Sequence, residues 1–169
     1  KVFGGCYGAN VTSGGTNVKI YGGTIGQVYG GNNQSGAIFG HIILNIEETG
    51  CKPIEIDDLY LGGNQASYSK YGYYVETAAT KDGGSGTSDP SDPSETVETD
   101  SDGRLIFKPR TSANDTHKAV YTYDRTDNSW TVYGQGTAPA TAPTYGDPVL
   151  NIISATRIGR VFGGGLGSG

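Results

Sequence analysis

The residues best suited to chemistry are acids gathered in one short stretch: Glu47, Glu48, Glu55, Asp57 and Asp58. Paired carboxylates can cleave glycosidic bonds, one as general acid and the other as base or nucleophile. Adjacent strand residues point to opposite faces, so only one of Asp57 and Asp58 can serve a single site. We therefore expect a solvated edge or loop, with a polysaccharide lyase or hydrolase using Asp57 or Asp58 as the alternative.

Histidines and cysteines are too few to support a metal centre. His41 and His117 lie far apart, and His41 is expected to face outward or to be satisfied within its strand. Cys6 and Cys51 are the only thiols. We expect two isolated buried residues, with a disulfide as the alternative. The sequence thus predicts no catalytic residue, no metal and no cofactor.

Aromatic residues offer a different chemistry. The candidates for ligand binding are the tyrosines and the tryptophan of one predicted hairpin: Tyr121, Tyr123, Trp130 and Tyr133. Exposed aromatic rings stack on sugars and anchor protein contacts because they are stiff and amphipathic. The alternative is that many of these rings form the small core of their own unit. A carbohydrate-binding role is therefore one of the functions to test.

A repeated phrase decides the expected fold. It recurs four times, as Val2-Phe3-Gly4-Gly5, Val28-Tyr29-Gly30-Gly31, Leu59-Tyr60-Leu61-Gly62 and Val161-Phe162-Gly163-Gly164. In three copies an isoleucine precedes the phrase at the same offset (Ile25, Ile56 and Ile158). Self-similarity at a period of a few tens of residues indicates a repeat architecture.

The alternation of apolar and polar residues around each phrase predicts short strands, and no stretch shows helical spacing. Glycine after each strand permits positive φ or close backbone approach. We expect an all-β fold, a parallel β-helix (solenoid) of about three coils. One file of the repeat residues, the aliphatic one, should face the core and the aromatic file should form a ladder. A β-sandwich is the alternative.

Three segments are predicted. Solenoid coils occupy 1–63 and resume at 148–169, and residues 64–147 form an inserted Tyr-rich antiparallel β-unit. Within the insertion we expect strands at 73–75 and 105–107 and a hairpin of 119–123 with 130–133. The Ser-, Asp- and Pro-rich stretch 82–103 has almost nothing to bury, so it reads as a disordered loop.

The amino-acid composition limits the classes of binding partner that we expect. Glycine supplies 29 of 169 residues and apolar residues only 34 %, which is typical of a thin core with many turns. A net charge of −5 with scattered basic residues argues against nucleic acid. No apolar run is long enough to span a membrane. The repeat at both ends predicts a segment of a longer protein, whose partners are its flanking coils, further copies of itself or surface glycans.

The phrases Ile25-Gly26-Gln27-Val28-Tyr29-Gly30-Gly31, Ile158-Gly159-Arg160-Val161-Phe162-Gly163-Gly164 and Asn17 to Gly23 carry a resemblance. They resemble very long glycine-rich repeat proteins of anaerobic gut bacteria, over residues 1–63 and 148–169. The chain departs from that pattern at Leu61, where glycine is usual. The resemblance implies a β-solenoid on an extended, exported or cell-surface fibre with a structural or adhesive role, and no catalytic residues.

Overall fold

The computed structural model describes residues 1–8, 12–75, 98–102, 105–112, 114–115, 120–124, 129–132 and 145–167, the backbone alone for Thr12 and for 120–124 and 129–132. Every regular element in these ranges is a β-strand. The chain divides into two compact units. Unit 1 comprises Lys1–Tyr68 with Gly146–Gly169, and unit 2 comprises Ser69–Tyr145.

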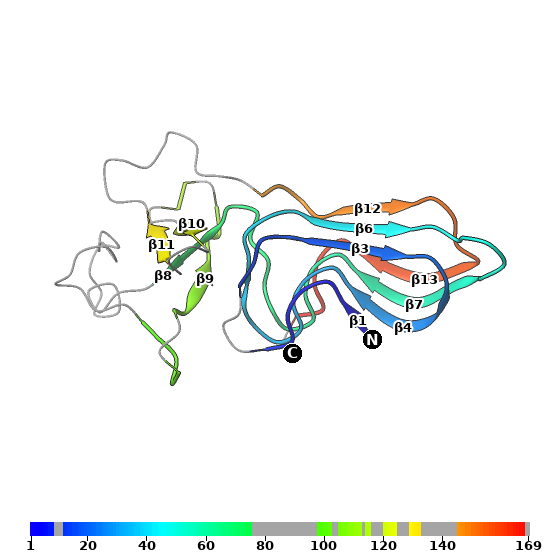
Figure 1. The fold of residues 1–169 in the computed structure, drawn as a ribbon, viewed down its shortest axis with the longest axis horizontal. Coiled ribbons are helices and arrows are strands. Elements are labelled where there is room, and N and C mark those ends of the chain that lie inside the picture. The colour runs from blue at the N-terminus through cyan, green and yellow to red at the C-terminus, as the bar shows by residue number, and fades with distance from the viewer. Residues whose placement is uncertain are drawn as a thin grey trace. The chain divides into compact units, whose positions relative to one another are not determined.

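Unit 1 is built from parallel strands in three sheets (Figure 1). The largest has the order β1-β4-β7-β13, with β1 at Val2–Phe3, β4 at Gly23–Tyr29, β7 at Ile54–Tyr60 and β13 at Arg157–Phe162. The second has the order β12-β6-β3, with β3 at Thr16–Ile20, β6 at Ile42–Ile46 and β12 at Val149–Ile152. The third pairs β2 (Thr12–Ser13) with β5 (Ala37–Ile38). Strands of the two larger sheets run in opposite directions (Figure 1).

The repeat phrases lie at the ends of the strands of the largest sheet, in register. Val28 aligns with Val2 on one side and with Leu59 on the other, and Leu59 aligns with Val161. The aromatic residue that follows is aligned in the same way in all four strands. Segments that are far apart in the sequence therefore place equivalent side chains next to one another.

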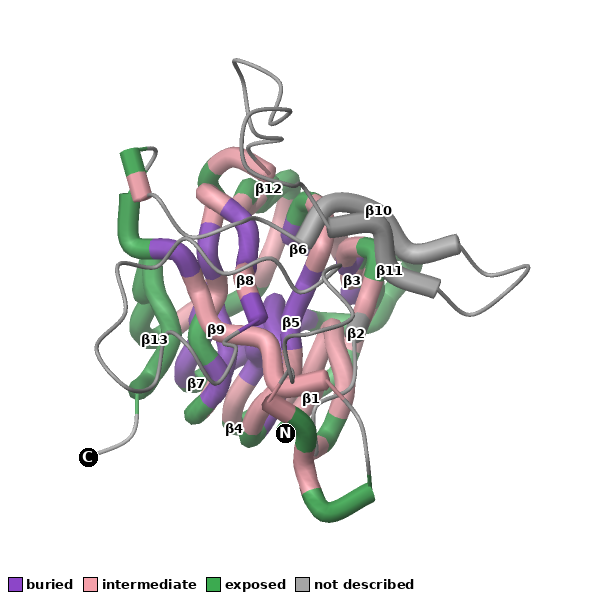
Figure 2. Tube along the Cα trace, turned by 90° about the vertical axis from the view of Figure 1, so that its left-hand side faces the viewer, coloured by how far each residue is buried: buried purple, intermediate pink, exposed green. Residues whose placement is uncertain are grey.

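The aliphatic file faces the core, as the sequence predicted. Val28, Ile56 and Leu59 are fully buried, and the end members Val2 and Val161 lie at the outer strands. Figure 2 shows the buried segments along the inner strands of unit 1. The cluster gathers the branched side chains of both larger sheets and β5: Ile20, Val28, Ile38, Ile42, Leu44, Ile46, Ile54, Ile56 and Leu59.

The two inner rings of the aromatic file are also buried, although only one of the two files was expected to face the core. Ring centroids are 4.9 Å apart between Phe3 and Tyr29, 4.8 Å between Tyr29 and Tyr60, and 4.6 Å between Tyr60 and Phe162. Each inner ring is covered on both faces by its neighbours. Consequently Tyr29 is 0 % and Tyr60 only 5 % exposed.

The glycines of the phrase are required for close approach rather than for positive φ. A Cβ at Gly30 would lie 2.5 Å from the Leu61 carbonyl oxygen, and one at Gly62 would lie 2.7 Å from the Gly165 nitrogen. Neither glycine has a positive φ. Any side chain here would therefore push neighbouring repeats apart, which is one reason for glycine at these positions.

Unit 2 contains an antiparallel sheet of order β11-β10-β8-β9. Its strands are β8 (Tyr73–Val75), β9 (Phe107–Pro109), β10 (Val120–Asp124) and β11 (Ser129–Val132). The predicted hairpin is confirmed, because Tyr123 pairs with Trp130 and Asp124 with Ser129. The strand expected at 105–107 is wrong by two residues. Because β9 is an edge strand, it can include Pro109. Most of the predicted loop 82–103 lies outside the described residues.

Candidate functional site: the stacked strands of unit 1 and their edges

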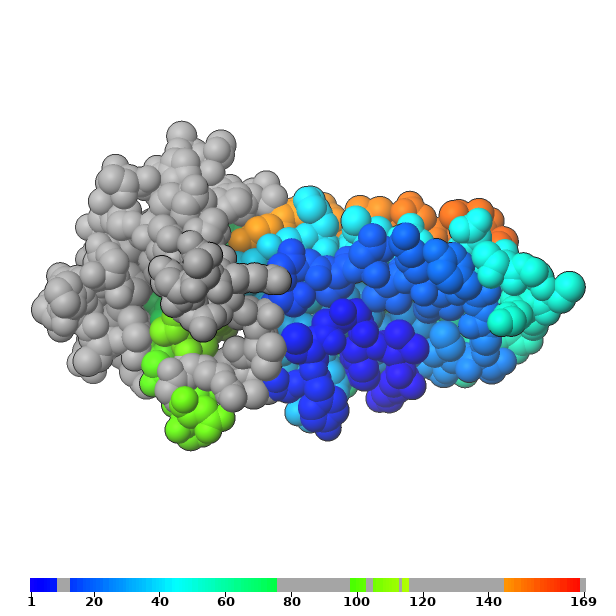
Figure 3. All heavy atoms as spheres, viewed as in Figure 1, coloured from blue at the N-terminus to red at the C-terminus, as the bar shows by residue number. Residues whose placement is uncertain are grey.

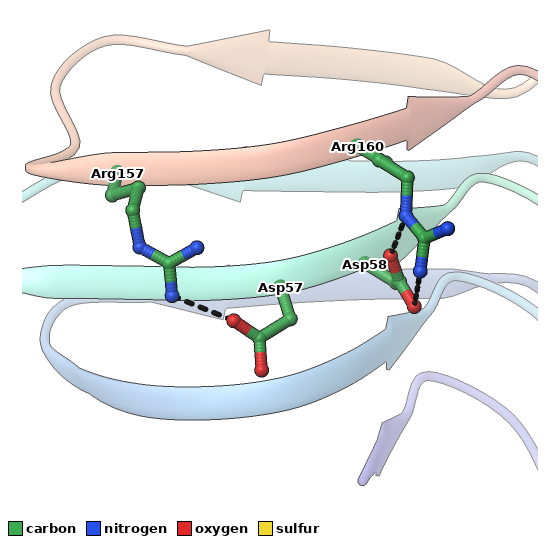
Figure 4. Close-up of polar contacts among 4 residues, drawn as sticks. All are labelled: Asp57, Asp58, Arg157 and Arg160. Carbon is green, nitrogen blue, oxygen red and sulfur yellow. Dashed lines mark hydrogen bonds and ion pairs between the residues drawn. The ribbon is translucent and has the colours of Figure 1, made fainter.

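The two acids first considered for catalysis are bound to arginines of the neighbouring strand (Figure 4). Arg160 of β13 donates from Nε to Asp58 Oδ1 over 2.6 Å and from Nη2 to Oδ2 over 2.9 Å. Arg157 donates from Nη2 to Asp57 Oδ1 over 2.6 Å. These charge-assisted bonds raise the pKa of both guanidinium groups. The acids therefore act as ties between β7 and β13.

The regular alternation of side chains along β7 is interrupted at Asp57. Ile56 and Leu59 both lie in the core although they are three positions apart, so the regular alternation is interrupted between them. The register of β7 with both neighbours passes over Asp57, opposite Gly26 and Gly159. Strict alternation was the reason for expecting Asp57 and Asp58 on opposite faces, and here it does not hold. Both carboxylates instead accept bonds from β13.

Glu48 forms a second tie between segments. Its Oε1 accepts a bond of 2.7 Å from the Ile54 backbone N–H and one of 2.6 Å from the Thr156 hydroxyl. Its own N–H donates to Ser154 Oγ over 2.8 Å. The bond from Ile54, followed by that from Thr156, lowers the pKa of the Glu48 carboxyl. Glu48 thus joins the segments before β7 and β13.

The acidic cluster therefore does not assemble as a pair of carboxylates ready for acid–base work. Asp57, Asp58 and Glu48 each bind a partner on a different segment, and Asp58 is only 7 % exposed. His41 is exposed, as expected, and lies next to Gly146. Within the described residues, no three His, Cys, Asp or Glu side chains form a group that could hold a metal ion.

Asparagines form a polar ladder along the second sheet, which the sequence analysis missed. Asn151 Nδ2 donates to Asn45 Oδ1 over 2.9 Å, and Asn45 Nδ2 donates to Asn17 Oδ1 over 3.1 Å. Both of these amide donors therefore point toward the N-terminal strand β3. The signal was present in the sequence, because Leu44-Asn45-Ile46 and Leu150-Asn151-Ile152 repeat the same triplet and pair in register.

Two open edges bound this stack. We call the outer sides of β12 and β13 the C-terminal edge and those of β1 and β3 the N-terminal edge, since each strand has one neighbour in its sheet. In Figure 3, β12 (orange) lies beside β6 (cyan) along one margin of unit 1. Residues equivalent to buried ones become exposed at the C-terminal edge: Ile152 is 48 %, Val161 47 % and Phe162 38 % exposed.

The two cysteines are free in the structure. Cys6 is half-buried, and its backbone N–H donates to Asn32 Oδ1 over 2.8 Å. Cys51 is exposed, so the expectation that both thiols are buried is wrong. Its neighbour Gly50 has a φ of 65°, which places Cys51 in a turn between β6 and β7 instead of on a core-facing strand.

The predicted aromatic ligand-binding residues belong to unit 2. Tyr121 and Tyr123 lie on β10 and Trp130 on β11, where the structure describes the backbone alone. Tyr133 lies outside the described residues. For such a site the structure therefore describes the register of β10 with β11, which places Tyr123 directly opposite Trp130.

Arg110 is a buried polar residue of unit 2 that sequence reasoning did not single out. It is 7 % exposed, and its guanidinium donates to the backbone carbonyls of Tyr71 over 3.1 Å and of Asp115 over 2.5 Å. Its own carbonyl accepts a 2.6 Å bond from Ser69 Oγ. Arg110 therefore connects the loop of Ser69 and Tyr71 with the segment of Asp115.

Comparisons with protein-family models, with curated proteins and with solved structures found no match to this chain. Among the described residues, no helix has the length and apolar character needed to cross a membrane.

Proposed function

We propose that the chain is a non-catalytic structural segment of an extracellular or cell-surface bacterial fibre or stalk with an adhesive role. Successive repeats of unit 1 would be successive coils of a β-helix, each contributing one strand to each of the two larger sheets. The observation that carries this proposal is the register of the four repeat phrases, which aligns Val2, Val28, Leu59 and Val161 across four strands. Repeats that contact only their neighbours form extended scaffolds. The resemblance to exported glycine-rich repeat proteins supports the location.

The contacts of the polar residues favour a structural role for this chain and disfavour the alternative, a β-helix polysaccharide lyase or hydrolase. Asp58 accepts two bonds from Arg160, and Asp57 accepts one from Arg157. The two bonds from Arg160 engage both carboxylate oxygens of Asp58, so this group is already committed to a contact between strands. Glu48 is likewise held by hydrogen bonds to two segments. These groups serve the stacking of strands.

Amide hydrogen exchange tests the scaffold. Strands β4 and β7 have a bonded neighbour on both sides, whereas β1, β12 and β13 have one. A stack of coils predicts the slowest exchange in β4, β6 and β7, and progressively faster exchange toward both edges. Equal exchange rates in β4 and in β13 would contradict the proposed stack. An assay for cleavage of polysaccharides, with Asp57→Asn and Asp58→Asn as controls, tests the enzymatic alternative directly.

A carbohydrate-binding module is the second candidate, and the pairing of Tyr123 with Trp130 favours it. Aromatic residues directly opposite each other on a hairpin are cross-strand neighbours, and aromatic rings combine a large apolar face with a polar group. On an array of glycans and mucins, this function predicts binding that is lost in Trp130→Ala and Tyr123→Ala. Tyr7→Ala is the matched control, because Tyr7 is 73 % exposed and lies on unit 1. Loss of binding in that control would instead place the glycan-binding surface on unit 1.

A further inference from the structure

We propose that the C-terminal edge of one copy of this chain binds the N-terminal edge of a second copy, head to tail. This inference rests on the proposed function, because it assumes that the strands of unit 1 stack as successive coils. The strands within each of these sheets are parallel. The outer side of β13 therefore matches the outer side of β1 in direction, and β12 matches β3 in the same way. An unpaired strand edge is a template for such an addition.

The apolar residues at the two edges are matched in type. The existing register aligns Val28 with Leu59 and Tyr29 with Tyr60. Continuing that register beyond β13 would place a second copy's Val2 against Val161 and its Phe3 against Phe162. Phe162 stacks on Tyr60 through one face and is 38 % exposed. A second copy would cover the other face and extend the aromatic ladder.

The polar ladder of the second sheet has a direction, and its end fits the same partner. Asn151 donates to Asn45, so the Asn151 Oδ1 acceptor is left at the C-terminal edge. Lys19 of β3 is in register with Asn45 and is exposed. A second copy's Lys19 would therefore lie in register with Asn151, where its ammonium group can donate to that oxygen. In the first sheet a second copy's Lys1 would approach Arg160, whose charge is offset by Asp58.

A glycine at the C-terminal edge has space that its equivalents lack. The second glycines of the first three phrases each have the next repeat close by. A Cβ at Gly31 would lie 2.9 Å from the Gly63 nitrogen, and one at Gly62 would lie 2.7 Å from the Gly165 nitrogen. A Cβ at Gly164, the equivalent in the fourth phrase, meets nothing within 4 Å. Gly164 thus leaves open the approach that a further repeat needs.

The two edges differ from each other, so this contact is heterologous and does not close on itself. Repeated addition gives an open series of copies, as expected for a head-to-tail interface without a closing rotation. Pairing of two C-terminal edges would instead give a closed dimer. The oligomer distribution therefore distinguishes these arrangements.

Sedimentation velocity of the 169-residue chain tests the proposal. We expect a weight-average mass that rises with concentration above the 17.6 kDa of one chain. Val161→Lys puts a charge at the centre of the C-terminal edge. Lys19→Pro blocks the N-terminal edge, and its lost N–H points away from β6 because Thr16 and Ile20 supply the bonds to that strand. Each variant alone should remain a single chain at every concentration.

Mixing the two variants provides the decisive result. The unblocked N-terminal edge of Val161→Lys fits the unblocked C-terminal edge of Lys19→Pro, so the mixture should form one-to-one pairs and stop there. Gly164→Ala should weaken self-association of the otherwise unchanged chain at least tenfold, and Gly26→Ala, at an inner strand, should not weaken it. Circular dichroism must show the same β-structure for every variant.

Three results would overturn the proposal. If the unchanged chain stays monomeric at all concentrations, copies of the chain do not bind one another through these edges. If Val161→Lys still forms dimers, the contact joins like edges. If the mixture forms no pairs, the contact is not head to tail. In each case slow amide exchange in β4 and β7 would leave the proposed scaffold intact, whereas loss of that protection would mean that the scaffold itself fails.

Discussion

Tyr29 of β4 and Tyr60 of β7 stack with ring centroids 4.8 Å apart and ring planes within 7° of each other. They come from adjacent repeats, and their neighbours Phe3 and Phe162 continue the stack on either side. The Tyr29 hydroxyl is buried without a hydrogen-bond partner. Burial, then the proximity of Tyr60 and of Asp58, raises the pKa of the Tyr29 phenol. The ring of Tyr29 thus contributes to stability while its hydroxyl detracts from it.

Substitutions at Tyr29 should separate these two contributions. Tyr29→Ala removes a fully buried ring and should lower the free energy of unfolding by about 3–5 kcal/mol. Tyr29→Phe keeps the ring and removes only the unpaired hydroxyl, so it should raise that free energy by about 1 kcal/mol. Denaturant titration followed by far-ultraviolet circular dichroism measures both changes. A large loss of stability in Tyr29→Phe would show that the hydroxyl has a partner.

The repeat glycines offer a matched pair at equivalent positions. Gly62→Ala places a methyl group against the backbone of Gly165, and overpacking of this kind should cost about 1–3 kcal/mol. Gly164→Ala meets no atom within 4 Å and should leave the stability of the single chain unchanged. Thermal unfolding at low protein concentration compares them. Equal losses in the two variants would mean that crowding by the next repeat is not the reason for glycine.

The parts of the fold that depend on repetition were predictable from the sequence. Phrases with matched internal offsets predicted parallel strands in register, and the aliphatic file with Val28 and Leu59 was correctly assigned to the core. The burial of Tyr29 and Tyr60 was not predicted. Alternation assigns one face of a strand to the core, and the mutual coverage of stacked rings appears only when the spacing between strands is known.

The polar ties could be predicted only in part. The asparagine ladder was recoverable, because Asn45 and Asn151 occupy the same place in a repeated triplet. The pairing of Asp58 with Arg160 joins residues 102 positions apart, and nothing local in the sequence connects them. The slip in alternation at Asp57 was likewise invisible, since it depends on which apolar residues reach the core.

The ion pair of Asp58 and Arg160 should behave as one unit. Asp58→Ala and Arg160→Ala each remove the same two-point contact between β7 and β13. The double variant should therefore lose less stability than the sum of the two single losses. Denaturant titration of all four proteins in low and high salt measures this coupling, which salt should weaken. Additive losses would show that the pair does not tie the strands.

Tyr145 should make unit 2 sensitive to alkali. Burial, and then the proximity of Tyr73, raises its pKa from 10.0 to about 12. The unfolded chain therefore loses this proton at lower pH than the folded chain does. The stability contributed by Tyr145 is complete below pH 10 and is lost as the pH rises toward 12. Tyr145→Phe should resist unfolding in this window, as followed by tyrosinate absorbance. An unchanged alkaline midpoint in the variant would contradict the assignment.

Glu48 should give unit 1 an opposite sensitivity, to acid. Its folded pKa lies below the ordinary value of 4.5 because the Ile54 N–H and the Thr156 hydroxyl donate to the carboxylate. The folded state thus holds this proton less tightly than the unfolded state. The stability contributed by Glu48 is complete above pH 4.5 and is lost as the pH falls through the folded pKa.

Glu48→Gln should therefore be less stable than the unchanged chain at neutral pH, and this difference should shrink as the pH falls below 4.5. Glu47→Gln is the matched control: in the described structure the Glu47 backbone N–H bonds to Ile20, and its side chain ties no segment to another. Chemical denaturation from neutral pH to pH 3 compares the three proteins. A difference between Glu48→Gln and the unchanged chain that stays constant with pH would show that the carboxylate charge does not hold Ile54 and Thr156. In that case the contact of the Glu48 side chain with Ile54 and Thr156 would not depend on its charge. The segments before β7 and β13 would then be joined by Ser154 and the backbone.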